Sequence, residues 1–383
     1  MVHKRKRSSS KQKKKSQHQD IPFVIETMDG LGQGVSKVNN KVTFIAKTLP
    51  GEQGVAIVHK RSKGVIFAQL KQLETSASDR RESLCPHFDD CPACHYLHTE
   101  YKQELGFKKQ SLSDISRHLA LPEKGIDIFS APSRLHYRNR IQLHYRHQYI
   151  GMVNALTDDI VEIPECKIIR PELQAAFDSL YSDKNWCNTH SGRGHVELYW
   201  RPEEGVTIQW NEAYAFGGFS QVYDAMNQML CSHVYDYLNL INADSVLDLF
   251  SGEGNLTNDY ISVKQKIRKM IDFSPENQAS DFSCLDLFSD NALSQFQRLH
   301  KKAVFDTLVV DPPRKGFPLL VKWIKHYKPK HLIYVSCNAA TQVRDLQSLD
   351  KDNIDYTIET MSLLDLFPST YHYESIAYIK FKQ

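Results

Sequence analysis

From about residue 216 onward, short apolar runs alternate with helical segments. The apolar runs occupy residues 246–250, 307–310, 332–335 and 375–381. Strands that alternate with helices form an open, mostly parallel sheet, so this part of the chain is predicted to be an α/β domain over residues 216–383. Ligands bind at the carboxyl ends of the strands in such sheets, and the residues after each run are therefore candidate site residues.

The rest of the chain divides into three further segments. Residues 1–20 carry eight Lys or Arg and one acid, and lack the apolar side chains that offset ordering entropy, so we expect a disordered basic tail. The remaining chain has a formal net charge of about −4, which argues against a generally basic nucleic-acid binder. Residues 79–215 are predicted to form a mixed central domain.

Residues 21–78 contain short β-rich runs separated by Gly-rich or polar turns, a pattern typical of a small closed barrel. The run DGLGQGV at 29–35, Val42, and LPGE at 49–52 resemble the TRAM domain, an OB-like RNA-binding module. The alternative is a structural barrel without a ligand.

Four cysteines suggest a metal or cluster site in a reducing compartment. Cys85, Cys91 and Cys94 form a C-x5-C-x2-C run, and Cys166 follows at a distance. Three clustered thiolates and a remote one can enclose an iron–sulfur cluster or a tetrahedral zinc. A Cys–His zinc site stays open because histidines lie nearby, although zinc sites more often use two close pairs.

A candidate cofactor site follows the first strand-like run. The sequence SVLDLFSGEGN at 245–255 places Gly252 and Gly254 where the backbone must approach a ligand. The third Gly of the dinucleotide fingerprint is replaced by Thr257, which disfavours NAD. The run resembles the first motif of S-adenosylmethionine-dependent methyltransferases. Asp272, at the end of the next strand-like run, is expected to accept hydrogen bonds from the ribose hydroxyls of the cofactor. Asp286 is expected to lie near its adenine.

Three further motifs occupy later strand ends. They are DPPRKG at 311–316, SCN at 336–338 followed by Thr341, and FPSTYHYE at 367–374. In this order they resemble the RNA uracil-5-methyltransferases, and with the barrel and the four cysteines the chain is most similar to the bacterial 23S rRNA branch. The resemblance covers residues 21–383. It implies a Rossmann-like methyltransferase domain, S-adenosylmethionine and a 4Fe–4S cluster held by Cys85, Cys91, Cys94 and Cys166.

The resemblance also implies roles for individual residues. Cys337 matches the nucleophile and Glu374 the general base. Cofactor-binding positions match at Gln221, Phe250, Asn255, Asp272, Asp286 and Asp311. The partner would be RNA, most specifically 23S rRNA, and the protein a cytoplasmic monomer without a membrane segment.

Alternatives remain on the sequence. A tRNA uracil-5-methyltransferase is one, although those usually lack both the barrel and the cysteines. Another is an RNA-binding or assembly factor without turnover, because residues 273–285 leave little room for a normal crossover helix and the adenine pocket is expected to be more open. Arg134, Arg138, Arg140 and Arg146, interleaved with Tyr137 and Tyr145, either grip RNA or are ordinary half-exposed strand residues.

Overall fold

The computed structural model describes residues 19–154, 157–213, 220–273, 277 and 279–382. The chain forms two compact units. One comprises residues 19–28 and Gln33–Ser78, and the other comprises Asp29–Gly32 with residues 79–382. The expected tail falls outside the described residues except at its end, where Asp20 begins the first strand instead of closing the tail.

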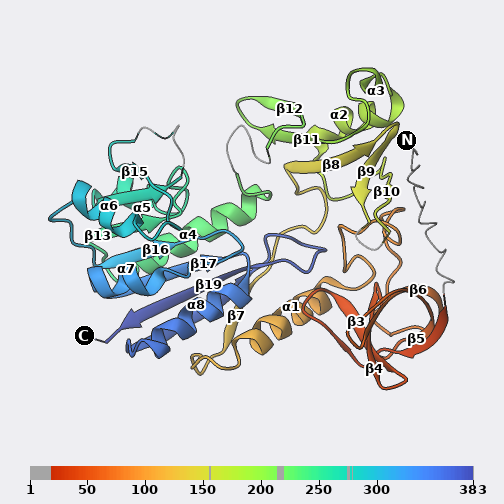
Figure 1. Cartoon of the computed structure of the whole chain (residues 1–383), viewed down its shortest axis with the longest axis horizontal. Helices are drawn as coiled ribbons and strands as arrows, with labels where there is room; N and C mark the ends of the chain where they lie inside the picture. The colour runs from red at the N-terminus through yellow and green to blue at the C-terminus, as the bar shows by residue number, and fades with distance from the viewer. Residues whose placement is uncertain (1–18, 155–156, 214–219, 274–276, 278, 383) are drawn as a thin grey trace, which may run out of the picture. The chain divides into compact units, whose positions relative to one another are not determined.

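The first unit is one six-stranded sheet of order β1-β5-β6-β4-β3-β2. Its strands are β1 (Asp20–Val24), β2 (Thr27–Met28), β3 (Gln33–Val38), β4 (Lys41–Ala46), β5 (Gln53–Ser62) and β6 (Val65–Thr75). The two edge strands, β1 and β2, follow each other in the chain, and the sheet curls into a barrel (Figure 1). Alternate side chains such as Phe23, Ile45 and Ile66 fill its interior.

The second unit contains a five-stranded antiparallel sheet of order β10-β9-β8-β11-β12. Its strands are β8 (Arg140–Arg146), β9 (Tyr149–Val153), β10 (Ile160–Val161), β11 (Arg193–Arg201) and β12 (Gly205–Trp210), with α2 (Pro171–Ser182) and α3 (Trp186–Thr189) between β10 and β11. Leu173 and Phe177 of α2 pack on Leu143 and Val196 of the sheet. One sheet face is therefore closed by this helix.

The same unit contains an eight-stranded sheet of order β15-β14-β13-β16-β17-β19-β18-β7. Its strands are β7 (Ile126–Phe129), β13 (Ser245–Leu249), β14 (Ile267–Asp272), β15 (Phe282–Cys284), β16 (Thr307–Val310), β17 (His331–Ser336), β18 (Tyr356–Leu364) and β19 (Glu374–Phe381). The run from β15 to β17 is parallel, whereas β19 is antiparallel to both β17 and β18. The sheet is thus mixed, and the α/β class expected from the sequence is confirmed at that level.

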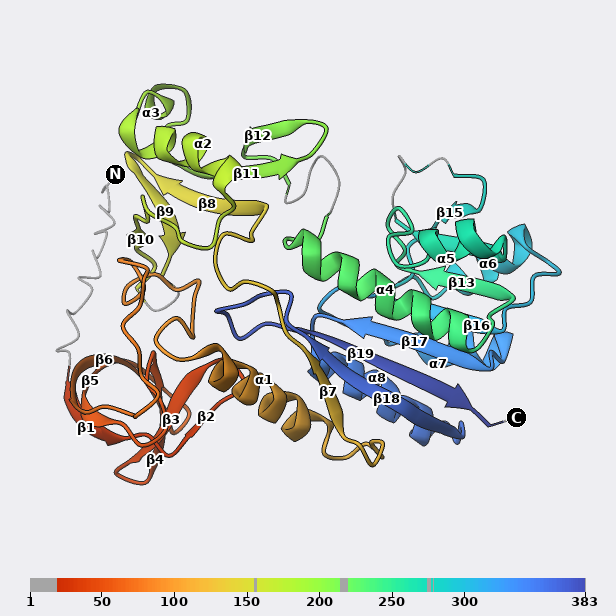
Figure 2. The ribbon, with the colours of Figure 1, turned by 180° about the vertical axis from the view of Figure 1, so that it is seen from behind.

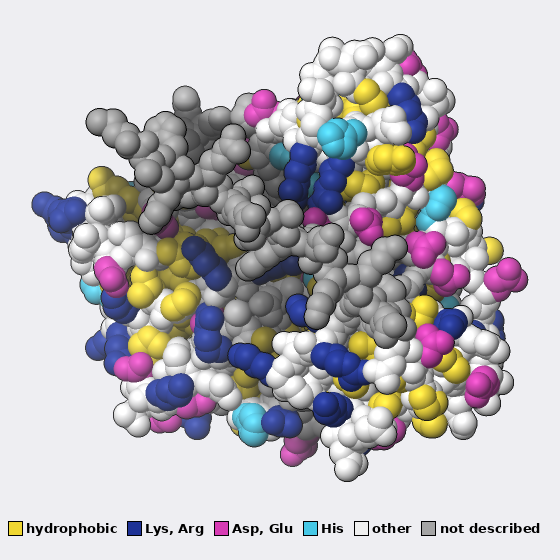
Figure 3. Space-filling view, turned by 45° about the vertical axis from the view of Figure 1, so that its right-hand side comes forward, with side chains coloured by type: hydrophobic (Ala, Val, Ile, Leu, Met, Phe, Trp, Pro, Cys, Tyr) yellow, Lys and Arg dark blue, Asp and Glu magenta, His cyan; other side chains and the backbone are white. Residues whose placement is uncertain are grey.

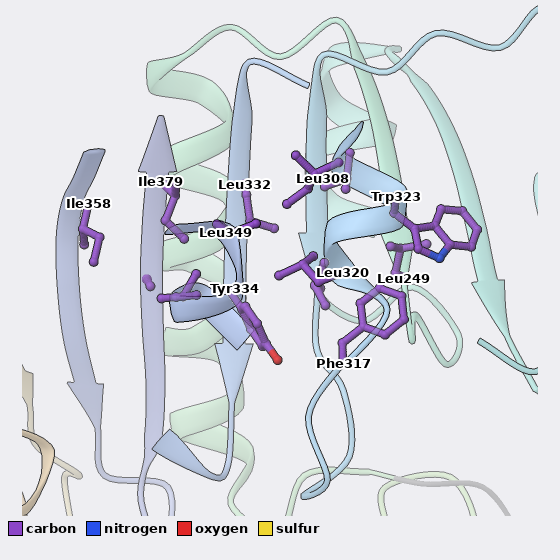
Figure 4. Packing of buried hydrophobic residues seen from close by; sticks show 14 of the residues in the cluster. Leu249, Leu308, Phe317, Leu320, Trp323, Leu332, Tyr334, Leu349, Ile358 and Ile379 are labelled. Atoms are coloured by element: carbon purple, nitrogen blue, oxygen red, sulfur yellow. The ribbon is translucent and has the colours of Figure 1, made fainter. Parts of the chain in front are cut away.

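Helices cover both faces of this sheet. They are α1 (Tyr101–Ser116), α4 (Asp224–Leu240), α5 (Asn258–Lys264), α6 (Ala292–Leu299), α7 (Leu320–Tyr327) and α8 (Ala339–Lys351). On one face, buried residues of α4 pack on Val246 and Val309, and Figure 2 shows this helix lying across the sheet. On the other face Leu320 and Trp323 of α7 pack on Leu308 (Figure 4). Strands buried on both faces explain the continuous apolar runs in the sequence.

Helix α1 and strand β7 differ from the sequence expectation. They lie within the segment 79–215 that we assigned to the central domain, yet β7 pairs in parallel with β18, and Leu112 of α1 belongs to the core of the large sheet. Both the central sheet and the large sheet therefore draw on residues before 216. Local sequence does not reveal this because strand pairing across more than two hundred residues is a tertiary event.

The connection between β14 and β15 is as short as the sequence indicated. Only residues 273–281 join these parallel neighbours, and the described ones among them are not helical.

Among the helices that the structure describes, none has the length and apolar character needed to cross a membrane.

Candidate active site

The carboxyl ends of neighbouring strands in the large sheet bring four separate motifs together. Pairing of Leu249 with Val310 and of Val310 with Tyr334 aligns the ends of β13, β16 and β17. Strand β19 runs the other way, so its first residue lies at the same edge, where Ser375 pairs with Ser336. Phe250, Asp311, Cys337 and Glu374 consequently follow one another along this edge.

This edge opens into a cavity of about 1610 Å³. All twelve site residues expected from the sequence line it: Cys85, Cys91, Cys94, Cys166, Gln221, Phe250, Asn255, Asp272, Asp286, Asp311, Cys337 and Glu374. The structure thereby gathers residues spread over 290 positions of the chain. Their individual roles stay predictions, because lining a cavity does not assign chemistry.

The glycine-rich turn after β13 is closed by backbone contacts with β14. The amides of Phe250 and Ser251 donate to Ile271 O, and the amide of Gly252 donates to the Asp272 carboxylate at 2.7 Å. Gly254 adopts φ +85°, and a Cβ there would lie 2.5 Å from Asn258 Oδ1 and 2.8 Å from Met270 Sδ. Only glycine fits this position without displacing its neighbours.

The other expected cofactor positions surround this turn. The side-chain amides of Asn255 and Asn227 bond each other in both directions, at 3.0 and 2.9 Å. The Phe250 ring lies edge-on to Phe317 at 5.0 Å. Asp286 is exposed, and its carboxylate accepts the amide of Phe288. The turn therefore offers a polar rim and an apolar wall.

A buried carboxyl, Asp248, and a half-buried one, Asp311, line the cavity near the turn. Burial raises the pKa of Asp248 to about 7, although the Thr257 hydroxyl donates to it at 2.6 Å. Burial, together with the charges of Asp248 and Asp272, also raises the pKa of Asp311. Such a cluster disfavours full ionisation and favours a positively charged ligand beside it.

Cys337 and Glu374 share the same electrostatic environment. Burial, followed by the charges of Glu374 and Asp311, raises the pKa of Cys337 to about 12. Burial and then Asp311 raise the pKa of Glu374 well above its usual range, while Arg314 lowers both values. Among the described residues Glu374 Oε2 is buried without a hydrogen-bond partner. A thiol beside a carboxyl with an open oxygen can support nucleophilic addition and proton transfer.

Sequence reasoning assigned no role to two further residues of the cavity. Arg314 lies within DPPRKG, and it is the cation that opposes the raised pKa of both reactive groups. His372 lies two residues before Glu374, and burial followed by Arg314 lowers its pKa to about 4. Both residues lie inside motifs on which the family resemblance rests. Their place in these motifs is the sequence feature that could have marked them as site residues.

The four predicted cluster cysteines lie on one wall of the cavity. Cys91 and Cys94 are buried, Cys85 and Cys166 are half-buried, and all four are free thiols. Burial raises the pKa of Cys166 to about 11, to which the charges of Cys91 and Cys85 contribute. Within the described residues, no group of three or more His, Cys, Asp or Glu is arranged to hold a single metal ion. The common place of the four cysteines on the cavity lining is compatible with a shared ligand set.

The arginine-rich stretch is mostly structural. Arg134 donates to the carbonyls of Tyr96 and Thr99, and buried Arg140 pairs with Glu197. Tyr137 and Tyr145 are buried in the core, which favours the structural alternative over base stacking for these rings. Of the four arginines only Arg138 lines the cavity.

Comparison with known proteins identifies similar chains. A family model described as tRNA (Uracil-5-)-methyltransferase matches residues 288–382. The chain is 26% identical to the 23S rRNA (uracil(1939)-C(5))-methyltransferase RlmD of Pectobacterium atrosepticum, over 94% of this chain and 93% of that protein. It is 27% identical to the protein of the same name from Vibrio campbellii, over 95% of this chain and 97% of the relative.

A solved structure is similar over nearly the whole chain. It is the tRNA (uracil-54, C5)-methyltransferase of Pyrococcus abyssi in complex with S-adenosyl-L-homocysteine. The TM-score is 0.67 at 20% identity, with 94% of this chain and 100% of the other covered. At this identity the likeness establishes the fold.

Proposed function

We propose that this chain, whose membership of the RNA uracil-5-methyltransferase family is supported by the family model and the curated relatives, methylates C5 of a uridine in 23S rRNA. S-adenosylmethionine supplies the methyl group. The observation that carries the proposal is the convergence of Phe250, Asp311, Cys337 and Glu374 on one cavity. Whole-length similarity to curated rRNA methyltransferases favours 23S rRNA as the substrate.

Uracil explains why a thiol and a carboxylate are both needed. C5 is a weak nucleophile until the Cys337 thiolate adds to C6 and turns the ring into an enolate. C5 then attacks the methyl carbon of the cofactor, and S-adenosylhomocysteine leaves. Glu374 removes the C5 proton, the bond between C6 and Sγ breaks, and the double bond between C5 and C6 forms again with release of the thiolate.

The charges in the cavity suit a cationic methyl donor. The sulfonium of S-adenosylmethionine would lie beside Asp311, Cys337 and Glu374, whose ionised forms burial disfavours. Cofactor and Arg314 together would therefore lower the pKa of the nucleophile in the complex. In this proposal the thiol is activated when the substrates are bound, and unproductive reactions of a free thiolate are avoided.

Cofactor recognition is proposed for six residues. Asp272 and Asp286 would bind the ribose and adenine ends, and Phe250 would line the apolar wall. The remaining three, Gln221, Asn255 and Asp311, would contact the methionine part of the cofactor. The two oxygens of the Asp272 carboxylate accept the amides of Gly252 and Phe273, so this side chain shapes the turn, and its remaining lone pairs would accept hydrogen bonds from the ribose hydroxyls.

The cysteine set is proposed to hold a 4Fe–4S cluster through Cys85, Cys91, Cys94 and Cys166. A cubane bonds each thiolate to a different iron and keeps the sulfurs farther apart than a single zinc does. Anaerobically purified protein should contain iron and absorb broadly in the visible range. Zinc without iron would contradict the assignment.

RNA binding outside the cavity is proposed for the barrel of residues 21–78, as a TRAM-like module, and for the basic tail. Lys and Arg side chains are interspersed with acidic ones on the face shown in Figure 3. Deletion of residues 1–18 should weaken RNA binding and flatten its salt dependence, because counterion release scales with the phosphates neutralised. Methyl transfer at saturating RNA should be unchanged.

The deciding test is transfer of labelled methyl groups to 23S rRNA and to tRNA, both lacking native modifications. We expect 5-methyluridine at one position of 23S rRNA. The tRNA-specific description of the family model makes tRNA the second candidate, and methylation of tRNA alone would favour it. Failure with both RNAs under conditions that saturate the cofactor would favour a factor without turnover.

A further inference from the structure

Glu374, the proposed base, directly follows a loop whose position is set by contacts outside the two strands that it connects. Residues 365–373 connect β18 to β19, and Glu374 begins β19. Phe367, Thr370 and His372 of this loop line the cavity. Pairing with Leu364 fixes the backbone of Glu374, whereas the loop forms the wall beside its carboxyl.

Ser369, at the centre of the loop, is held from outside the hairpin. It is fully buried and adopts a left-handed φ of +69°, which is unusual for a residue other than glycine. Its amide donates to Glu104 Oε1 at 2.7 Å. Its carbonyl accepts the amides of His95 at 2.7 Å and Tyr96 at 3.1 Å. Helix α1 and the segment directly after Cys94 thus hold this strained position.

A buried charge cluster completes the attachment to α1. Lys108 Nζ contacts Glu104 Oε1 and Asp365 Oδ1, each at 2.7 Å, and donates to Phe367 O at 3.2 Å. The side chains of these three ionic residues are at most 1% exposed, and Arg134 Nη2, from a side chain 19% exposed, lies 2.7 Å from the second oxygen of Glu104. The Tyr101 hydroxyl donates to the second oxygen of Asp365 at 2.7 Å.

Stability alone does not account for such a cluster. Replacing a buried ion pair by apolar side chains is often neutral or stabilising, so buried charges are weak evidence for a stabilising role. The ammonium group instead provides three directed bonds, one to its own helix and two to the loop. Such an arrangement specifies one position of the loop more narrowly than apolar packing does.

We propose that Lys108, Glu104 and Asp365 are positioning residues for proton removal by Glu374, acting through the 365–373 loop. The inference rests on the proposed function. Cys337 follows β17, whose position is set by pairing with β16 and β19, so it does not depend on this cluster. Loosening the loop should therefore slow release of the methylated uracil more than it slows formation of the covalent complex.

The test is Lys108→Met, with Lys109→Met as the matched control on the exposed side of the same helix. In single turnovers with uridine-containing 23S rRNA, methyl transfer and loss of the covalent protein–RNA complex are followed separately. For Lys108→Met we expect release to slow about 10- to 100-fold and the complex to accumulate, with methyl transfer nearly unchanged. Lys109→Met should match the unaltered chain in both steps.

Tyr101→Phe gives the same test without removing a charge, and it protects the inference if Lys108→Met does not fold. It should slow release in the same direction. Because the hydroxyl also accepts the amide of Ala131 at 2.7 Å, the melting temperature should fall by about a few degrees while the variant stays folded. Equal slowing of both steps, or normal release from a folded Tyr101→Phe variant, would overturn the inference and leave the function intact. Absence of methyl transfer by the unaltered chain would overturn the function and the inference with it.

Discussion

The two halves of the large sheet differ in how deeply their proposed site residues are buried. The half that we call catalytic after its proposed role, β16, β17 and β19, is buried on both faces, and Glu374 is only 3% exposed. The half that we call the cofactor half after its proposed role, β13 to β15, ends in a three-residue strand after a short connection, and Phe273 in that connection is 71% exposed. Chemistry at a single bond needs fixed geometry, whereas a cofactor with many contacts tolerates a looser pocket.

The largest effect is expected in the catalytic half, at Cys337. Cys337→Ala should abolish the covalent complex with 5-fluorouridine-containing RNA, because no other group can add to C6. The complex is measured by gel shift under denaturing conditions, with Cys187→Ala as the cysteine control, because Cys187 packs in the core of the central sheet and does not line the cavity. Complex formation by Cys337→Ala would assign the nucleophile elsewhere.

Glu374→Gln comes next. An amide cannot take the C5 proton, so turnover should fall about 10²- to 10⁴-fold while the covalent complex accumulates on ordinary uridine RNA. Steady-state rates and the trapped fraction measure the two effects. Multiple turnovers at the normal rate would refute the base assignment.

Where the two halves meet, Asp248 should make the stability of the cofactor-free protein depend on pH. Its pKa is about 7 in the fold, above its ordinary value of 3.8, so the folded state retains a proton that the unfolded state loses. The protonated Asp248 therefore contributes fully to the free energy of unfolding below about pH 4. This contribution, up to about 4 kcal/mol, is lost as the pH rises to about 7. Asp248→Asn should remove this loss.

Urea unfolding at pH 4.5 and pH 8 measures the Asp248 effect as the difference between the unaltered chain and the variant. The advantage of Asp248→Asn should be larger at pH 8. Parallel changes in the two proteins would show that Asp248 does not hold the proton.

Gly254→Ala should damage the cofactor half selectively. Its Cβ would meet Asn258 and Met270 in a left-handed backbone, at a cost of about 1–3 kcal/mol. We expect weaker S-adenosylmethionine binding by calorimetry, with the conformational change confined to the turn. Gly252→Ala is the comparison, since space at that position is open although φ is +54°. Equal affinities in the two variants would argue against the steric explanation.

The smallest effect is expected at Phe273. Phe273→Ala removes an exposed ring from the proposed adenine side. It should weaken cofactor binding only about 2- to 10-fold and change the free energy of unfolding by no more than about 0.5 kcal/mol. Ile267→Ala, at the opposite end of β14 and 65% exposed, is the control. A large loss of affinity at Phe273 would mean that the cofactor half is tighter than its short connection indicates.

The sequence by itself determined the local chemistry. Motifs such as DPPRKG and FPSTYHYE are contiguous, so their residue types and their place after apolar strands were readable, and the family resemblance followed from their order. The short connection after Asp272 was readable too, since it is a matter of chain length. In each case the information lies within a few neighbouring residues.

Only the tertiary structure decided which distant segments meet. It added β7 to the edge of the large sheet, turned Arg134 inward to Glu104, and placed α1 under the loop that leads to Glu374. It also brought Cys166 to the same wall as Cys85 and Cys91. The physical reason is that an arginine or a lysine has the same local preferences whether it faces water or a buried carboxylate. Its partner is selected by the packing of the whole chain.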